Sequence, residues 1–224
     1  SLYLGPKKFE AADIRVAENF KKAAEKQQIR RIIYLGGLGD TQTSLSSHLR
    51  SRMEVAHELR RGKTPVTILR AGVIIGSGSA SYEIIQHLVR KLEVFLIPRW
   101  AQNKCQPIAI RDVIKYLVGV LEVSQTSGKN FDIGGQDILP YEDMLRVLSE
   151  ILVKKRIFVH LPFSNINIFA YFASLLTPVP TPITQCLMEG LKNEVICQNS
   201  LIKKYLPFEP MSYRESIVRA LSRE

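Results

Sequence analysis

The sequence predicts an α/β fold in which a doubly wound parallel sheet is followed by a small, mostly helical C-terminal lobe. The apolar run at residues 32–35 is short, as expected for a strand buried on both faces, and a second such run begins at Thr67. A helix-like segment connects them, and strand, helix and strand within about forty residues make one βαβ unit. From Lys154 onward, prolines interrupt short apolar segments, which is typical of short helices. We therefore expect a partial sheet domain at 1–153 and the lobe at 154–224.

The other elements follow from the spacing of apolar residues. Apolar side chains recur every three to four positions from Phe9 to about Gln28, which predicts an amphipathic helix. Pro140, followed by Tyr141 and two acidic residues, is a typical start for a helix that runs to Leu152. We also expect strands at 94–97 and 130–133, helices at 82–90 and 112–122, and a substrate-facing loop inserted around 92–108.

The composition limits the classes of function. With 224 residues, 46% of them hydrophobic, the chain can bury a sizeable core. Lys and Arg number 31 against 21 Asp and Glu, a net charge of +10, but the basic residues are spread along the chain. This distribution argues against nucleic-acid binding and favours anionic ligands such as a dinucleotide phosphate.

Cysteine usage and apolar run length bear on the compartment. Cys105, Cys186 and Cys197 are odd in number and lack C-x-x-C spacing, which argues against a metal site and against disulfides. A reducing compartment follows, and we expect the cytoplasm. The longest apolar run, residues 166–176, is shorter than the about 20 residues that span a bilayer, so we expect a buried helix there and no stable membrane span.

Five segments in order carry a family resemblance. They resemble the second half of an extended or atypical short-chain dehydrogenase/reductase, most closely the NmrA-like and nucleoside-diphosphate-sugar-epimerase-like proteins of the complex I 39-kDa subunit type. The resemblance implies a Rossmann-like sheet, NAD or NADP as cofactor, and oxidoreduction or epimerisation of a small organic or sugar-nucleotide-like substrate. The segments are RIIYLGGLGD (31–40), HLRSR (48–52), TILRAGVIIGSGS (67–79), QPIAIRDVIKYLVGVLE (106–122) and FDIGGQDILPYEDMLRVL (131–148).

The glycine-rich turn of this family is absent. Its first βα turn carries G-x-x-G-x-x-G, where a helix N-terminus meets the pyrophosphate. Gly36 and Gly39 have this spacing, but Gln42 stands at the third position. The turn at 76–78 is also glycine-rich, but the acidic ribose partner about 20 positions later is missing. We therefore expect a C-terminal portion that lacks about 90 residues of a full sheet, which leaves the choice between NAD and NADP open.

The helix after the first strand carries the candidate catalytic pair. The family places Y-x-x-x-K on this helix, with both side chains on one face. The matching positions here are His48 and Arg52. Histidine keeps a proton-transfer group with a pKa closer to neutral, and arginine keeps a cation that can hold a ribose or phosphate but will not deprotonate. The family's Ser or Thr at the preceding strand end is replaced by Gly36 or Gly37, so every member of the catalytic set has changed.

Two neighbouring segments complete the candidate site. The family's L-R-P-x-x-V segment lies beside the nicotinamide, and Trp100 and Gln106 stand in the loop that faces the substrate, where an aromatic ring and an amide suit an uncharged organic ligand. A buried ion pair for Arg70 and a packing role for Trp100 are equally compatible with the sequence. Besides His48 and Arg52, the resemblance implies that the following residues contact the cofactor: Gly36, Gly37, Arg70, Ala71, Gly72 and Val73.

The changed catalytic set leaves two hypotheses. In the first, the protein is an NAD(P)-dependent oxidoreductase or epimerase in which His48 transfers the proton. In the second, it is a non-catalytic regulatory or assembly protein that binds a dinucleotide, or only keeps the fold, and acts through partner contact. The oligomeric state is open, with a homodimer as one option.

Overall fold

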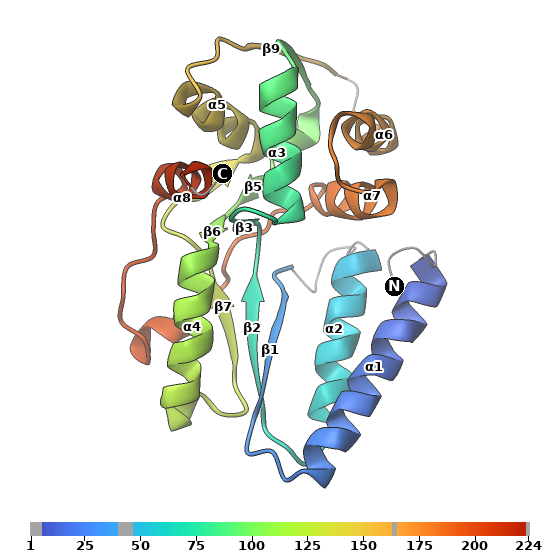
Figure 1. Cartoon of the computed structure of the whole chain (residues 1–224), viewed down its shortest axis with the longest axis vertical. Helices are drawn as coiled ribbons and strands as arrows, with labels where there is room; N and C mark the ends of the chain where they lie inside the picture. The colour runs from blue at the N-terminus through green and yellow to red at the C-terminus, as the bar shows by residue number, and fades with distance from the viewer. Residues whose placement is uncertain (1–5, 40–46, 163–164, 223–224) are drawn as a thin grey trace.

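The computed structural model describes residues 6–39, 47–162 and 165–222, with the backbone alone at 6–10 and 47–48. Its centre is a parallel sheet in the order β1 (Ile32–Gly37), β2 (Val66–Ala71), β7 (Asn130–Ile133) (Figure 1). Gly36 pairs with Arg70 and Gly37 with Ala71, so β1 and β2 end at the same edge. The expected α/β fold with parallel strands is confirmed.

Helices cover both faces of this sheet. On one face, α1 (Pro6–Lys26) and α2 (Ser47–Arg60) pack side by side, and α4 (Ile110–Glu122) covers the other (Figure 1). Adjacent residues of β2 point to opposite faces, as the pleat requires: Ile68 packs with the α1 and α2 side chains and Leu69 with those of α4. Both are almost completely buried, which explains why the strands have continuous apolar runs.

The second part of the molecule lies beyond the carboxyl ends of β1 and β2 (Figure 1). Here β4 (Val94–Ile97) pairs in parallel with β9 (Ile157–His160), so the mostly helical lobe also contributes a strand. This part also contains five helices among the described residues: α3 (Ala80–Lys91), α5 (Tyr141–Ile151), α6 (Ile166–Leu176), α7 (Thr181–Gly190) and α8 (Tyr213–Leu221).

Short elements connect the two parts. The strands β3 (Ile74–Ile75) and β6 (Ile108–Ala109) pair in parallel, and β5 (Lys104–Cys105) and β8 (Leu139–Pro140) pair antiparallel. The described residues also include three single-turn helices, η2 (Arg99–Gln102), η3 (Ser124–Thr126) and η4 (Leu201–Lys204).

The expected boundary at residue 153 stays a prediction. One hydrophobic core contains Val89, Phe95 and Met144 from before this position together with Tyr213 and Ile217 from after it. Residues on both sides of 153 therefore stabilise the same lobe.

Candidate functional site

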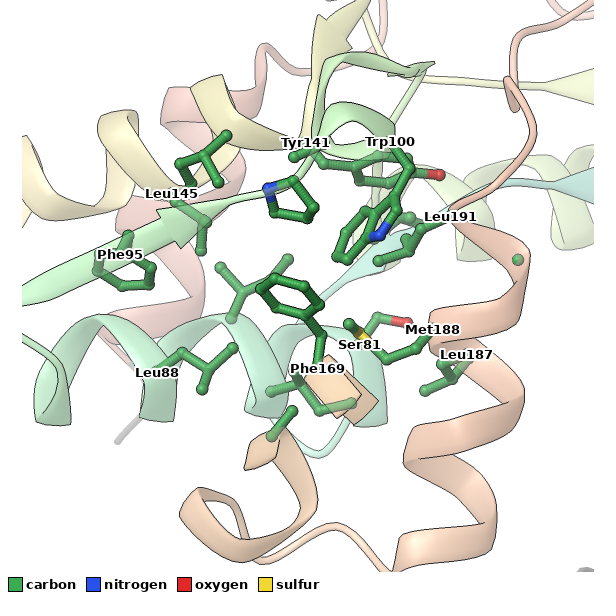
Figure 2. A pocket seen from close by; sticks show the side chains of 18 of the residues that line it. Ser81, Leu88, Phe95, Trp100, Tyr141, Leu145, Phe169, Leu187, Met188 and Leu191 are labelled. Carbon is green, nitrogen blue, oxygen red and sulfur yellow. The ribbon is translucent and has the colours of Figure 1, made fainter. Parts of the chain in front are cut away.

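A cavity of about 620 Å³ lies between the strand edge and the lobe. Its walls come from the ends of β1 and β2, from α3 and β4, and from α6 and α7. Figure 2 shows Trp100 and Tyr141 on one side, with Phe169, Leu187 and Leu191 around the same space. In open α/β sheets, ligands bind at the carboxyl ends of the strands, and this cavity begins there.

Five of the expected site residues line this cavity. Gly37, Ala71, Gly72 and Val73 lie at its strand end, and Trp100 lies in the wall built by η2. Gly37 and Ala71 end two neighbouring strands in register, and Gly72 and Val73 directly follow the second strand, which explains how the sequence brings these four residues together. That they contact a cofactor or a substrate stays a prediction.

The glycine at position 37 allows a close approach between β1 and α2. A Cβ atom there would lie 2.7 Å from Cδ2 of Leu49, so a larger residue would require the Leu49 side chain to shift. Leu49 lines the cavity and directly follows His48 in α2. Gly36 does not line the cavity, and a Cβ atom there would meet the ring of Tyr34 at 3.1 Å.

The candidate catalytic pair lies on α2, but its two members are described to different extents. The side chain of His48 lies outside the described residues, so its position relative to Arg70 is not tested. Arg52 lies near Tyr34 and near Cys186 of α7. Burial raises the pKa of the Tyr34 hydroxyl, and it raises the pKa of the Cys186 thiol to about 11. The positive charge of Arg52 opposes both of these shifts. Arg52 therefore stands between the sheet and the cavity wall that Cys186 helps to form.

Arg70 is held by an ion pair with the adjacent strand. Its Nε donates to Oδ1 of Asp132 at 2.7 Å, and its Nη2 lies 2.6 Å from the same oxygen. Asp132 is completely buried and also accepts from the backbone N–H of Gln198 at 2.9 Å. Arg70 does not line the cavity. The buried ion pair that the sequence allowed is what the structure contains, and cofactor contact by Arg70 stays a prediction.

Gln106 connects three chain segments. Its Nε2 donates to the carbonyl oxygen of Gly135 at 2.8 Å, and its Oε1 accepts from the backbone N–H of Cys197 at 3.1 Å. Both ends of the amide are thus used within the protein, and Gln106 is not among the cavity-lining residues. A contact with substrate stays a prediction that these hydrogen bonds do not favour.

The amino end of α3 already holds a carboxylate. Oε1 of Glu83 accepts from the backbone N–H of Gly78 at 3.1 Å. Because this negative group lies in the first turn of the helix, it competes with any anionic ligand there. The Glu83 side chain of α3 therefore already occupies a backbone N–H group of the preceding turn.

A polar cluster that the sequence did not suggest lies beside the cavity. Glu142, the residue after the cavity-lining Tyr141, accepts from Gln102 at 2.5 Å, from His160 at 2.9 Å and from Arg146. Burial alone would raise the pKa of the Glu142 carboxyl, but these hydrogen bonds hold the pKa below its usual value. The cluster ties η2, α5 and β9 together, and only the i, i+4 spacing of Glu142 and Arg146 could have been read from the sequence.

Two further findings concern the described part of the chain. It contains no group of three or more His, Cys, Asp or Glu side chains placed to hold a metal ion. None of its helices combines the length and apolar character needed to cross a bilayer.

The fold and its cavity define the class: a Rossmann-like α/β protein with the architecture of nucleotide-sugar epimerases and related reductases. UDP-glucose 4-epimerase of Thermotoga maritima, solved with UDP-glucose, superimposes with a TM-score of 0.70 over 97% of this chain and 71% of that one, at 13% identity. An NADPH-dependent quinone oxidoreductase of Escherichia coli gives a TM-score of 0.70 over 92% of this chain and 72% of that one, at 16% identity.

Sequence comparison finds a curated relative of this chain. No family model matches this sequence. A curated relative, the mitochondrial NADH dehydrogenase [ubiquinone] 1 alpha subcomplex subunit 9 of Arabidopsis thaliana, is 25% identical over 182 residues. The match covers 79% of this chain and 45% of the relative, so the chain spans less than half of that protein's length. The resemblance to the complex I 39-kDa type is thus confirmed by the relative that matches.

Proposed function

We propose that this chain is the substrate-side part of a protein that binds NAD or NADP, with the nicotinamide end at the carboxyl edge of β1 and β2. The observation that carries the proposal is that the cavity opens from this edge, between Gly37 and Gly72. Solved proteins with this fold include complexes with NADP and with NAD. The lining residues Gly37, Leu38, Gly72 and Val73 present no polar side chain, which suits one face of a nicotinamide ring.

The proposed chemistry is reduction or epimerisation, in which a bound dinucleotide supplies or accepts the hydride. His48 donates a proton to the substrate oxygen in one direction and removes it in the other, because an imidazole titrates near neutral pH. Arg52 stays charged and holds a ribose or phosphate oxygen near α2. Leu49 covers the end of β1 and keeps water from the reacting atoms.

A second candidate function is a non-catalytic one, in regulation or assembly. It is favoured by the chemistry of the described cavity wall, whose polar side chains are Ser81, Trp100, Tyr141 and Cys186. Burial raises the pKa of Tyr141 and raises that of Cys186 to about 11, so neither group exchanges a proton readily at neutral pH. The relative is itself named as a subunit of a larger enzyme. In this reading, the dinucleotide stabilises a surface that a partner contacts.

Compartment and assembly belong to the same proposal. The three unpaired cysteines fit a reducing compartment, for which the cytoplasm is the proposed one, whereas the relative is named as mitochondrial. A homodimer is proposed as the assembly and is tested by sedimentation of the purified chain at two concentrations.

A fluorescence titration tests the binding part of the proposal. NADH and NADPH are added separately to the full-length protein of which this chain is proposed to be a part, and saturable binding of at least one is expected. Val73→Glu, at the strand end of the cavity, is expected to weaken binding at least tenfold, while Val118→Glu on the exposed side of α4 is the matched control. If neither nucleotide binds, or both variants behave alike, this site is not the dinucleotide site.

A turnover assay separates the two functions. With a nucleotide bound, a panel of carbonyl compounds is offered to the full-length protein and to its His48→Ala variant. Turnover that is lost in His48→Ala at a nucleotide concentration that still saturates the variant supports the enzyme. Binding without turnover of any compound supports the regulatory or assembly role.

A further inference from the structure

The cavity wall is almost entirely hydrocarbon. Among the described lining residues there is no charged side chain, and the wall is built from leucine, isoleucine, valine, phenylalanine and similar residues. Leu88, Phe169 and Leu187 point into the space from three different helices (Figure 2). The volume of about 620 Å³ is that of a site for a whole organic ligand, not for a few water molecules.

The apolar wall continues to the surface. Val94 and Leu96 of β4 and Ile168 and Phe172 of α6 line the cavity and are each between 43% and 57% exposed. A ligand entering between β4 and α6 therefore meets hydrocarbon along its whole path.

This wall is unsuited to a sugar nucleotide. A nucleoside diphosphate carries negative charges and many hydroxyl groups, and transferring these from water into an apolar wall without partners costs several kcal/mol. Arg52 comes near the wall at Cys186 but is not one of the lining residues. An apolar molecule pays no such penalty and gains from burial.

We propose that this cavity binds the hydrocarbon chain of an apolar, uncharged ligand, such as an acyl or isoprenoid chain that carries a neutral oxygen. Trp100 supplies the polar contact, because it lines the cavity and its buried indole N–H has no hydrogen-bond partner among the described residues. This indole N–H donates to the carbonyl, ester or quinone oxygen of the ligand. As an assignment of substrate class, this proposal rests on the proposed function. The hydrocarbon ligand itself, however, binds without a dinucleotide.

Trp100 makes the test direct, since it is the single tryptophan of the sequence and lies in the cavity wall. The full chain, without nucleotide, is titrated with the methyl ester of cis-parinaric acid, an acyl probe that accepts energy from tryptophan. Decylubiquinone, which quenches tryptophan, is the prenyl-type arm, and UDP-glucose is the polar arm. We expect saturable energy transfer to the parinaric ester or saturable quenching by decylubiquinone. We expect no change in tryptophan fluorescence with UDP-glucose. The proposal is overturned if neither apolar probe saturates, or if UDP-glucose displaces them.

Two neighbouring aromatic residues on α6 give a matched pair of variants. Phe172 and Tyr171 are 57% and 55% exposed, but only Phe172 lines the cavity. Phe172→Glu is expected to weaken probe binding at least fivefold, and Tyr171→Glu less than twofold. Equal effects would place the probe on the outer surface and overturn the proposal.

Ligand protection of a thiol gives an independent measurement. Cys186 lines the cavity, whereas Cys197 does not. With either apolar probe bound, alkylation of Cys186 by N-ethylmaleimide is expected to slow at least threefold, with Cys197 unchanged, as read by peptide mass spectrometry. Because the nucleotide is absent, this result stands whether or not the dinucleotide proposal holds. Unchanged alkylation of Cys186 at saturating probe overturns the cavity as the binding site.

Discussion

Arg70 on β2 and Asp132 on β7 form an ion pair in which the carboxylate is completely buried and the guanidinium side chain is 27% exposed. The carboxylate accepts two bonds from Arg70 through one oxygen, while its other oxygen accepts from the backbone N–H of Gln198. This pair therefore fixes both the strand edge and the segment that follows α7. An enzyme-like site built on Arg70 would have to use the guanidinium N–H groups that do not contact this carboxylate.

Asp132→Asn is expected to destabilise the protein by about 3–5 kcal/mol, because it leaves a partly buried guanidinium without its counter-charge. Urea unfolding of the wild-type protein and of Asp132→Asn measures the difference in the free energy of unfolding. Glu150→Gln is the control, since the pair of Glu150 with Arg214 is exposed on both sides and is expected to contribute about 0–1 kcal/mol. Equal losses in the two variants would contradict the structural role of Asp132.

Glu142→Gln is expected to destabilise the lobe in a pH-dependent way. The hydrogen bonds from Arg146, His160 and Gln102 hold the pKa of Glu142 below its ordinary value of 4.5 against the effect of burial. A carboxyl whose pKa is lowered by folding stabilises the protein above its unfolded pKa, and this contribution is lost as the pH falls through the folded pKa. We expect a difference of about 1–2 kcal/mol at neutral pH, because charged hydrogen bonds contribute this much when their partners are partly exposed.

Urea unfolding of the wild type and Glu142→Gln at about pH 7 and about pH 3.5 checks this expectation, with the difference shrinking at the lower pH. Glu215→Gln, at an exposed pair on α8, controls for general charge effects. If the difference in the free energy of unfolding between the two proteins grows on acidification, folding raises the pKa of Glu142 instead of lowering it.

Gly135→Ala is expected to be among the most damaging single substitutions. A Cβ atom at this position would overlap the backbone carbonyl oxygen of Pro107, which cannot move without breaking the hydrogen bond that Gly135 donates to it at 3.0 Å. A loss of more than about 2 kcal/mol follows from such overpacking. Gly190→Ala is the matched control, because nothing lies within 4 Å of its Cβ position. A thermal shift for Gly135→Ala as small as that of Gly190→Ala would contradict the described packing.

All three cysteines are expected to react slowly with thiol reagents in the folded state. Burial raises the pKa of Cys105 and Cys197 to about 12 and that of Cys186 to about 11, and only the thiolate reacts. Absorbance assays with Ellman's reagent at about pH 8 are expected to find three reactive thiols in denaturant and a much slower reaction without it. A fast native reaction of one thiol would identify a cysteine that is more exposed than described.

The sequence predicted the central elements well because the local spacing of apolar residues reflects which side chains these elements bury. The strands at 94–97 and 130–133 have the expected bounds, and the helices expected at 82–90 and 112–122 were found with ends shifted by one or two residues. The strand β9 (Ile157–His160) was not expected, since three of its four residues are exposed and its partner β4 is far away in the sequence.

The site was predicted only in part, for a similar reason. Gly37, Ala71, Gly72 and Val73 were brought together because parallel neighbouring strands end at one edge. The partners of Arg70 and Gln106 come from segments more than 25 residues away, and no local spacing indicates them. The apolar wall of the cavity combines α3, α6 and α7, so its chemistry becomes visible only after folding.

The parallel pair of β4 with β9 has a consequence for how the chain folds. A parallel pair cannot close through a hairpin, and the segment that joins these strands contains η2, α4, β7 and α5. The ribbon therefore forms only after those elements are in place, and such long-range pairing slows folding. In a refolding time course, the amides of β4 and β9 would gain protection from hydrogen exchange later than those of β1 and β2.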